Sequence, residues 1–490
     1  MKATVIGSGF SGLSSAAFLA QAGYSVNVIE KNSHIGGRAR KFYAEDFMFD
    51  MGPSWYWMPD VFENFFNKFN KSTGDYYELI KLDPGFQIIF QNNETLQVPS
   101  NQEDLKQLFE NIETGSSQKL TSFMKEAKFK YDFSMNSFIY NPGISWKEVI
   151  KKDIFQNMFR LQLFQSYKKH VAKYFKNEKL RALLEFPVLF LGTAPKDTPA
   201  LYSLMAYSGL IDGTYYPLGG FNNVIKGMST LCKELGVNFH TSENVQKIQI
   251  KNNIASHVDT NNSSFPSDIV IGSADYNHIE NKLIDLKYRN YSQKYWSKRV
   301  FSPSCLLFYI GLNKKLNKVI HHNLFFDADI EQHIQEIYKD KTWPSNPLFY
   351  ACCPSKTDPN VAPEGHENLF LLIPITPGLK DEKNTHEKYF QMIIKRLENY
   401  CGENIQDSII YKKSYCINDF INDYNAYKGN AYGLANTLLQ TANLKPSIVN
   451  QKVSNLYYTG QLTVPGPGVP PSLISGQIVA QHVINKHQLK

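Results

Sequence analysis

The stretch that decides the fold lies at the start of the chain and reads Ala3-Thr4-Val5-Ile6-Gly7-Ser8-Gly9-Phe10-Ser11-Gly12. A short apolar run leads into a Gly-x-Gly-x-x-Gly turn, and the residues that follow place an apolar face on a helix that ends at Gly23. Residues 24–29 then read as a second strand, which closes on Glu30. Strand, glycine turn, helix, strand and acid in this order predict a dinucleotide-binding unit.

Each residue type in this unit has a physical role. Gly7 permits the tight turn, Gly9 leaves room for a pyrophosphate beside the backbone, and Gly12 lets the helix pack close to the strand. The free N–H groups and the positive end of the helix dipole face the phosphates. The carboxylate of Glu30 can bind an adenosine ribose and would repel a 2′-phosphate, which argues against NADP. The expected contacts here are Gly7, Gly9, Phe10, Ser11, Gly12, Glu30 and Lys31.

A second glycine pair follows soon after the first unit. Gly36 and Gly37 again allow a ligand to approach the backbone, and Arg38 brings a guanidinium to another face of the pyrophosphate. The alternative is a plain glycine turn with a solvated arginine. Residues 50–54 form another tight, backbone-rich turn. The expected contacts from these two segments are Gly37, Arg38, Gly52, Pro53 and Ser54.

Glu30, the Gly36-Gly37-Arg38 turn and the Asp50-Met51-Gly52-Pro53-Ser54 turn together resemble the amine-oxidase-like FAD superfamily. Within it the chain is most similar to the bacterial-type phytoene desaturases and related carotenoid desaturases. The likeness continues through residues 191–193, 199–202, 216–220, 354–365, 432–434 and 440–442. The resemblance implies an FAD cofactor and desaturation of an acyclic C40 carotenoid, with phytoene converted to lycopene in several steps as the preferred reaction.

The C-terminal segment also fits a flavin site. Residues 456–459 read as a strand, a glycine- and proline-rich stretch follows, and a helix is expected from residue 472 to about residue 486. A helix N-terminus aimed at the flavin would stabilise negative charge on its reduced ring. Where relatives in the superfamily often have an acid, this chain has Gln461. The resemblance implies contacts from Val245, Gly460, Gln461, Gly468, Val469 and Pro470.

The expected fold class is α/β, with a Rossmann-like FAD domain of the GR2 type and an inserted α+β substrate domain. The FAD domain comprises residues 1–75, 215–285 and 435–490, and residues 76–214 and 286–434 form the substrate and membrane-associating domain. Residues 236–240 and 245–250 read as strands of a second layer, and residues 268–275 as a strand that returns to the cofactor. Two apolar runs, at 306–312 and 369–375, read as buried strands.

The amino-acid composition limits the kinds of partner and of binding site that the chain is expected to have. With 42% hydrophobic and 20% charged residues the chain is globular, and 33 Phe and 29 Tyr can line an apolar cavity. Six cysteines in 490 residues argue against a disulfide framework, and no His joins Cys at zinc-ligand spacing along the sequence, so no metal site is predicted. His321 and His322 are interpreted as loop imidazoles without partners. A net charge of +7 gives no nucleic-acid prediction, and no apolar run approaches the roughly 18 residues of a membrane span.

One basic segment predicts a membrane surface instead. Apolar residues recur at helical spacing between residues 146 and 181, at Ile150, Ile154, Phe155, Met158, Phe159, Leu161 and Leu163. Residues 167–176 alternate cations and aromatics, which suits a helix lying on an anionic membrane. The chain is therefore expected to be a peripheral protein on the cytoplasmic side of a membrane. The alternative is a core-packed helix with a solvated basic face.

Several functions stay open. A later carotenoid desaturase acting on a hydroxylated or otherwise modified carotenoid, for example at the 3,4 bond, shares the same motifs. An amine oxidase would want an aromatic cage that the sequence does not indicate. A non-redox isoprenoid-binding escort protein is disfavoured by the intact Gly7, Gly9, Gly12, Glu30 and Arg38. The sequence identifies neither a catalytic base nor an oligomeric state.

Overall fold

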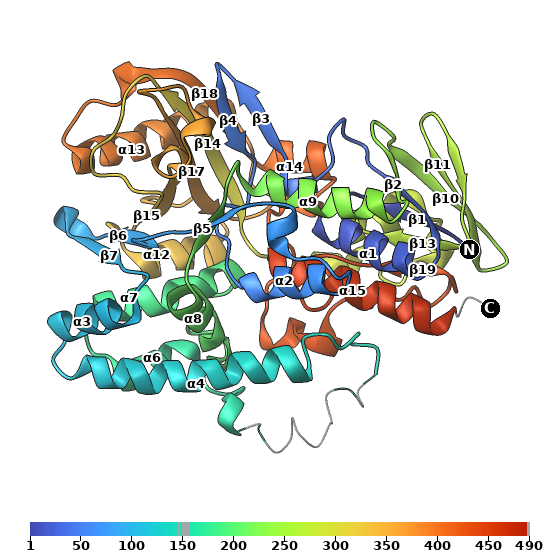
Figure 1. Ribbon diagram of the computed structural model, residues 1–490, viewed down its shortest axis with the longest axis horizontal. Helices are drawn as coiled ribbons and strands as arrows, with labels where there is room; N and C mark the ends of the chain where they lie inside the picture. Colours follow the sequence, from blue (N-terminus) through green and yellow to red (C-terminus); the bar gives the residue numbers. More distant parts are fainter. Residues whose placement is uncertain (146–147, 149–156, 158, 488–490) are drawn as a thin grey trace.

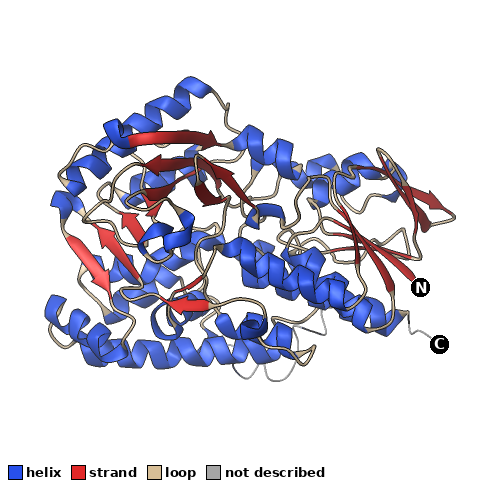
Figure 2. Ribbon diagram, turned by 45° about the horizontal axis from the view of Figure 1, so that its top comes forward, coloured by secondary structure: helices blue, strands red, loops and turns tan. Residues whose placement is uncertain are grey.

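Two large β-sheets, one parallel and one largely antiparallel, stand on either side of the centre of the molecule (Figure 1). The computed structural model describes residues 1–145, 148, 157 and 159–487. A group of helices lies below the antiparallel sheet in Figure 1, and both termini lie at the opposite end. Figure 2 shows that helices flank both sheets, as expected for the α/β class.

The first sheet has five parallel strands in the order β19 (Leu456–Tyr458), β13 (Ile269–Gly272), β1 (Lys2–Ile6), β2 (Ser25–Ile29) and β9 (Asn238–His240). The strands expected at residues 3–6, 24–29, 268–275 and 456–459 are confirmed. The assignment of residues 236–240 to a second layer is wrong, because β9 pairs in parallel with β2 and extends the same sheet. Helix α9 (Phe221–Glu234) leads into β9 and carries the chain back to this edge, as parallel pairing requires.

Different elements cover the two faces of this sheet. Helices α1 (Phe10–Gln21), α9 (Phe221–Glu234) and α15 (Val469–Lys486) pack on one face. A small antiparallel sheet of β10 (Val245–Lys251), β11 (Ile254–Thr260) and β12 (Ser264–Pro266) covers the other. Val5 and Ile6, neighbours on β1, accordingly belong to separate cores. Helix α15 begins at Val469, earlier than the expected residue 472, because its prolines occupy the first turn.

The second sheet has seven strands in the order β18 (Ile409–Tyr415), β14 (Ser304–Leu312), β17 (Glu367–Ile375), β16 (Phe349–Cys352), β15 (His322–Phe325), β6 (Phe86–Ile89) and β7 (Thr95–Val98). Only β15 and β6 pair in parallel. The buried strands expected at 306–312 and 369–375 are confirmed as β14 and β17. Helix α13 (Lys383–Cys401) packs on Leu306 and Leu371, while their neighbours Leu307 and Phe370 face the other way.

Shorter elements connect these layers. They are β3 (Lys41–Ala44), β4 (Phe47–Asp50), α2 (Pro59–Asn67), β5 (Leu79–Lys81), α8 (Leu204–Tyr207), β8 (Tyr215–Pro217), α10 (Tyr276–His278), α11 (Gln293–Ser297), α12 (Ile330–Gln335) and α14 (Ile417–Tyr424). The proposed domain boundaries stay a prediction.

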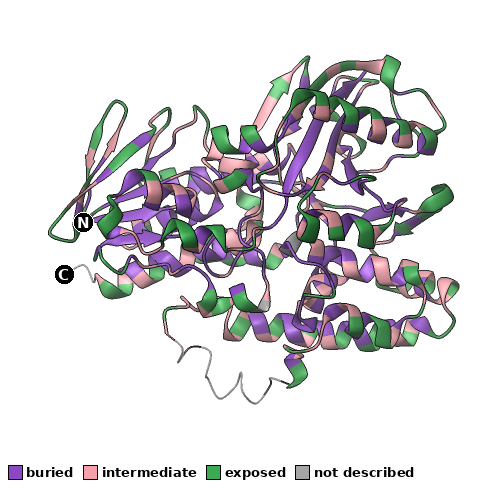
Figure 3. Ribbon diagram, turned by 180° about the vertical axis from the view of Figure 1, so that it is seen from behind, coloured by how far each residue is buried: buried purple, intermediate pink, exposed green. Residues whose placement is uncertain are grey.

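The helical group contains α3 (Gln102–Ile112), α4 (Ser116–Ser137), α6 (Tyr167–Tyr174) and α7 (Glu178–Glu185). Part of the basic segment that was expected to lie on a membrane belongs to this group. Tyr167, Val171 and Phe175 are buried in the core, whereas Lys169, Lys173 and Lys176 are exposed. Figure 3 shows that the helices of this group are buried on one side and exposed on the other. Contact of the exposed basic side with a membrane stays a prediction. The expected positions Ile150, Ile154, Phe155 and Met158 lie outside the described residues. Among the helices that are described, none has the length and apolar character that a membrane crossing requires.

Candidate functional site

A large cleft runs between the two sheets and encloses about 1630 Å³ together with its open mouth. Its lining comes from the first glycine turn, the ends of β2 and β13, the second glycine pair, β14, β17, α14 and the start of α15. Ligands in open α/β sheets bind at this carboxyl edge of the strands. The expected contacts that line the cleft are Gly7, Gly9, Phe10, Ser11, Glu30, Lys31, Gly37, Arg38, Gly52, Pro53, Val245, Gly460, Gln461, Gly468 and Val469.

Three expected contacts do not line the cleft. A Cβ at Gly12 would stand 2.1 Å from the Gly7 carbonyl oxygen, so this glycine allows α1 to pack against the turn, the role expected from its position. Pro470 lies in the first turn of α15. The side chain of Ser54 is directed to the Tyr350 hydroxyl, 3.0 Å away, and lines a small adjoining cavity.

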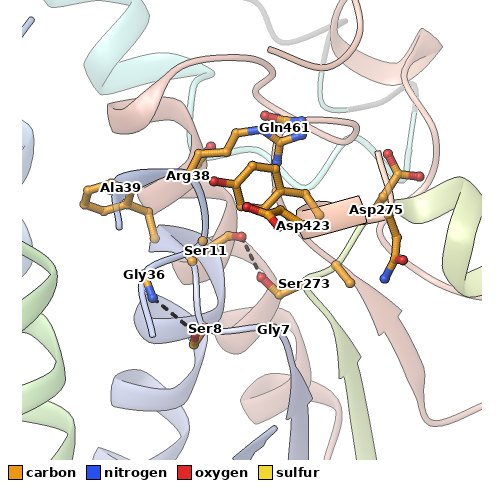
Figure 4. Close-up of a pocket in the computed structure, with 18 of the residues that line it drawn as sticks. Gly7, Ser8, Ser11, Gly36, Arg38, Ala39, Ser273, Asp275, Asp423 and Gln461 are labelled. Atoms are coloured by element: carbon orange, nitrogen blue, oxygen red, sulfur yellow. Dashed lines mark hydrogen bonds between the residues drawn. The ribbon is translucent and has the colours of Figure 1, made fainter. Parts of the chain in front are cut away.

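Ser8 ties the first turn to the second strand and to the second glycine pair. Its hydroxyl donates to Oε2 of Glu30 at 2.6 Å. It also accepts from the Gly36 amide at 3.2 Å, a bond drawn in Figure 4. Oε1 of Glu30 accepts from the backbone and side-chain nitrogens of Asn32, both at 2.9 Å. The three loops that carry the expected nucleotide contacts are thus held as one unit. Sequence reasoning missed Ser8, although its place inside the motif was a signal.

Arg38 supplies a cation at the centre of the cleft. Its Nη2 donates to the Asn430 carbonyl at 3.1 Å, whereas its buried Nε has no partner among the described residues. Burial lowers the pKa of the guanidinium from its ordinary value, and the neighbouring Tyr424 and Asp275 oppose that shift. Figure 4 shows Arg38 and Gln461 together above the first turn. A buried donor without a partner is costly, which indicates that a ligand satisfies it.

The backbone at Gly9, in the lining of the same cleft, is open. No heavy atom lies within 4 Å of the point where a Cβ of Gly9 would stand, and a Cβ on Gly37 would meet the Gly9 backbone at 3.3 Å. The helix dipole of α1 begins directly after Gly9. A guanidinium whose Nε is free and a helix start without side chains line the same cleft, and together they fit a pyrophosphate. The residues present therefore fit the phosphates of FAD, with Glu30 placed for the ribose.

Helix α14 and the turn after it, residues 417–425, form a strap along this side of the cleft. Asp423 binds Arg40 at 2.6 Å, and the ring of Tyr424 lies 4.9 Å from the Arg38 guanidinium carbon. Lys31 donates to the Asn422 carbonyl at 2.5 Å, and burial lowers its pKa. Asp423, Tyr424 and Asn425 line the cleft and were missed, because nothing local in the sequence links them to residues almost 400 positions earlier.

The far end of the cleft joins α15 to an apolar wall. Gly460 donates its amide to the Ser475 hydroxyl at 3.0 Å, and the Gln461 side chain reaches Oδ1 of Asn430 at 3.4 Å. Gly468 and Val469 bring the positive end of α15 to the lining. Facing them, the second sheet contributes an apolar surface made of Cys305, Leu307, Phe370 and Leu372. The cleft thus has a polar half for a nucleotide and a dry half beyond it.

The interpretation of His321 and His322 as partnerless loop imidazoles is wrong. Both are buried, and Nδ1 of His321 bonds the Thr357 hydroxyl at 2.7 Å while Nδ1 of His322 bonds the Tyr350 hydroxyl at 2.6 Å. Cys352 stands opposite His322 in the β15–β16 ladder, and one ligand-type atom from each of the three residues lies within 4.8 Å of the others. Sequence spacing missed this group because a strand ladder assembles it.

The comparisons with known proteins agree with this geometry. Residues 10–484 match the family model described as flavin containing amine oxidoreductase. The chain is 38% identical to a carotenoid 3,4-desaturase of Haloarcula japonica, with 98% of this chain and 97% of that protein covered. It is 27% identical to a zeta-carotene-forming phytoene desaturase of Myxococcus xanthus, with 98% and 93% covered.

A solved structure of putrescine oxidase shares the fold, with a TM-score of 0.64, 13% identity and 99% of both chains covered. At that identity the likeness concerns the fold alone. The matching family model spans the cleft from the first glycine turn to α15, and the residues of that cleft fit the cofactor that the family uses. The chain belongs to the flavin-containing amine oxidoreductase family and is an FAD-dependent oxidoreductase.

Proposed function

We propose that this protein desaturates an acyclic carotenoid. The observation that carries the proposal is the 38% identity to a carotenoid 3,4-desaturase over nearly the full length of both chains. The cleft supports it chemically, because an apolar wall of Leu307, Phe370 and Leu372 lies beside the expected flavin site. A hydrocarbon has no charged group to anchor, so it needs such a dry surface.

Different residues of the chain would bind the cofactor and enclose the substrate. Arg38, the Gly9 backbone and the start of α1 would hold the pyrophosphate, and Glu30 would hold the ribose. The first turn of α15 would bring its positive end toward the flavin ring. Bound FAD supplies the hydride acceptor that desaturation requires. The apolar side chains of β14 and β17 keep water away from the carbon chain.

The bond that is oxidised has two candidates. We propose the 3,4 bond of a later carotenoid as the first, because the 38% relative carries that activity in its name. Phytoene, which the sequence motifs favoured, is the second candidate, supported by the 27% relative.

Anaerobic mixing with carotenoid in liposomes tests the proposal. We expect the oxidised-flavin band of the holoenzyme to bleach without added nicotinamide, while the carotenoid spectrum moves to longer wavelength. Phytoene and a more unsaturated acyclic carotenoid are compared in parallel, and the faster one identifies the bond. Bleaching only with an amine, or only with NADH, would contradict desaturation.

We also propose that the protein works on the cytoplasmic surface of a membrane. The side chains of Phe159, Phe164 and Leu439 are 88%, 82% and 78% exposed, which favours contact with lipid. Lys169 and Lys173 on α6 add exposed positive charge. Lys168 is less suited to this role because it pairs with Glu331 at 2.6 Å.

Cosedimentation with anionic liposomes tests the membrane proposal. Changing Phe159 and Phe164 to Ser should lower binding, and Leu286→Ser, a change at a site 72% exposed, should serve as the matched control without effect. Changing Lys169 and Lys173 to Glu should lower binding further, by about 1 kcal/mol for each lysine lost. Equal binding by all these variants would contradict the proposal.

A further inference from the structure

Two histidines and a cysteine bring three metal-binding side chains to one buried place beside the cofactor cleft. His321 directly precedes β15, His322 begins it, and Cys352 ends β16 opposite His322 in the antiparallel ladder. One ligand-type atom from each of the three side chains lies within 4.8 Å of the other two. All three residues are at most 4% exposed. The pairing of two strands therefore assembles a His-His-Cys group.

The spacing of two of these atoms is close to that around a bound ion. Cys352 Sγ lies 3.8 Å from Nδ1 of His322. Zinc bonds to nitrogen at about 2.0–2.1 Å and to sulfur at about 2.3 Å, so tetrahedral ligands of these two kinds stand about 3.6 Å apart. The same Nδ1 also contacts the Tyr350 hydroxyl at 2.6 Å, but that hydroxyl keeps Ser54 as a partner at 3.0 Å if an ion takes the nitrogen.

His321 contributes a nitrogen that lacks a partner. Its Nδ1 bonds the Thr357 hydroxyl at 2.7 Å, which leaves Nε2 buried and without a hydrogen bond among the described residues. An unpaired buried polar atom costs about 1–3 kcal/mol, and a bound ion is one explanation for it. Burial lowers the pKa of His321 to about 3 and holds that of His322 well below 6.5, so both imidazoles are neutral, as metal ligands must be.

Cys352 supplies the soft ligand and decides the class of ion. Burial raises the pKa of its thiol to about 12, so the thiol keeps its proton unless a cation replaces that proton. A thiol that coordinates a metal is deprotonated outright. Two imidazoles and a thiolate favour a divalent ion of the zinc type, whereas magnesium and calcium prefer oxygen ligands.

A small cavity gives an ion a route to this group. His321 and Cys352 both line that cavity. Gly52 and Phe370 line both the cavity and the cofactor cleft, so the two spaces adjoin. An ion can thus enter through the cleft before FAD fills it, and a water in the cavity can supply the fourth ligand.

We propose that His321, His322 and Cys352 bind one structural divalent ion of the zinc type, through one nitrogen of each imidazole and the thiolate. The ion links β15 to β16 at the place where the cavity meets Gly52 of the cleft. This site belongs to the fold rather than to the carotenoid reaction, so it holds whichever substrate the protein takes.

Cys353 and Tyr350 provide matched controls. Cys353 is the next residue after Cys352 and is also buried, but it packs in the core on the other face of the sheet. Tyr350→Phe removes the hydroxyl that competes for Nδ1 of His322 and leaves all three ligands in place. A general disturbance of this buried region would affect the control variants as well, whereas loss of a ligand is confined to the three proposed positions.

The experiment measures the metal content of the FAD-loaded full chain, purified from zinc-supplemented cells and gel-filtered. We expect stoichiometric zinc in the wild type, in Cys353→Ala and in Tyr350→Phe. His321→Ala and Cys352→Ala should lose the zinc and keep their flavin, because losing a ligand should weaken binding by more than the about 10–100-fold that changes around the ligands cost. Cobalt(II) added to zinc-free wild-type protein should give the strong ligand-field bands of a tetrahedral ion, at longer wavelengths than the flavin absorbs.

Three results would overturn the inference. Zinc retained by both His321→Ala and Cys352→Ala would place the ion elsewhere, for instance at the second group of this kind, Asp381, His386 and Cys416. Equal loss of zinc from Cys353→Ala would show a general disturbance rather than loss of a ligand. Wild-type protein that gives no cobalt bands at stoichiometric addition would exclude the site, and this titration decides the matter even if the ligand variants fail to fold.

Discussion

The two walls of the cleft are built in different ways. On the side of the parallel sheet, Gly7, Gly9, Glu30 and Arg38 come from turns that directly follow β1 and β2 within forty residues. On the side of the seven-stranded sheet, β14, β17 and the α14 strap come from residues 304–425. The first wall is encoded by local sequence, whereas the second depends on how distant segments pack. Substitutions on each side of the cleft test this difference.

Gly12→Val should have the largest effect, because it disrupts the packing of α1 against the first glycine turn. Its Cβ would stand 2.1 Å from the Gly7 carbonyl oxygen, and neither backbone segment can yield without displacing α1 from the sheet. Overpacking a core costs about 1–3 kcal/mol, and a clash with backbone costs more. We expect little soluble protein and a lost helical signal by circular dichroism. A folded variant with full flavin content would show that α1 is not held as described.

Gly9→Val should abolish FAD binding without unfolding the protein. Gly9 has an extended backbone, with φ of −75°, and open space where the Cβ would stand, so valine fits the apoprotein. The same side chain then fills the place of the pyrophosphate. Flavin absorbance of the purified variant should vanish. The variant apoprotein should melt within about 2 °C of the wild-type apoprotein, because its free energy of unfolding should change by less than about 1 kcal/mol. A variant that retains flavin would contradict the assignment of the first glycine turn as the pyrophosphate site.

Arg38→Ala should weaken FAD binding without abolishing it. Removing a charged donor to the pyrophosphate should cost about 1.5–3 kcal/mol, or about 10- to 150-fold in FAD affinity. Equilibrium titration of apoprotein with FAD measures the change. Arg40→Ala is the control, because Arg40 pairs with Asp423 and is not part of the cleft lining. Similar losses in both variants would mean that Arg38 acts only through the strap.

Tyr424→Ala should have the smallest effect and probes the second wall. The tyrosine ring supports the Arg38 guanidinium, and such a contact is worth about 0.5–1 kcal/mol, or about two- to fivefold in FAD affinity. Tyr424→Phe keeps the ring and should bind FAD as the wild type does. If the phenylalanine variant is as weak as the alanine variant, the hydroxyl rather than the ring is what matters.

The same contrast explains how far the sequence could be interpreted. The βαβ unit, the buried strands and most cleft residues around Glu30 and Arg38 were predictable, because glycine spacing and apolar runs are local signals. The strap at Asp423 and Tyr424 and the pairing of Cys352 with His322 were not, because tertiary packing and strand register create them. The expected membrane contact of residues 167–176 stays a prediction, because an alternation of cations and aromatics fits both a membrane-bound helix and a half-buried helix with a solvated basic face.

The strand order of the parallel sheet also orders events during synthesis. β1 lies between β2 and β13, and β13 in turn needs β19, which begins only at Leu456. Helix α1 packs on α15, which follows β19 in the chain. A ribosome must therefore deliver almost all of this sequence before the sheet closes, and contacts so distant in sequence form slowly. Until then the cleft lacks Gly460, Gln461, Gly468 and Val469, so FAD can meet its full set of contacts only in the finished fold, which its binding then stabilises.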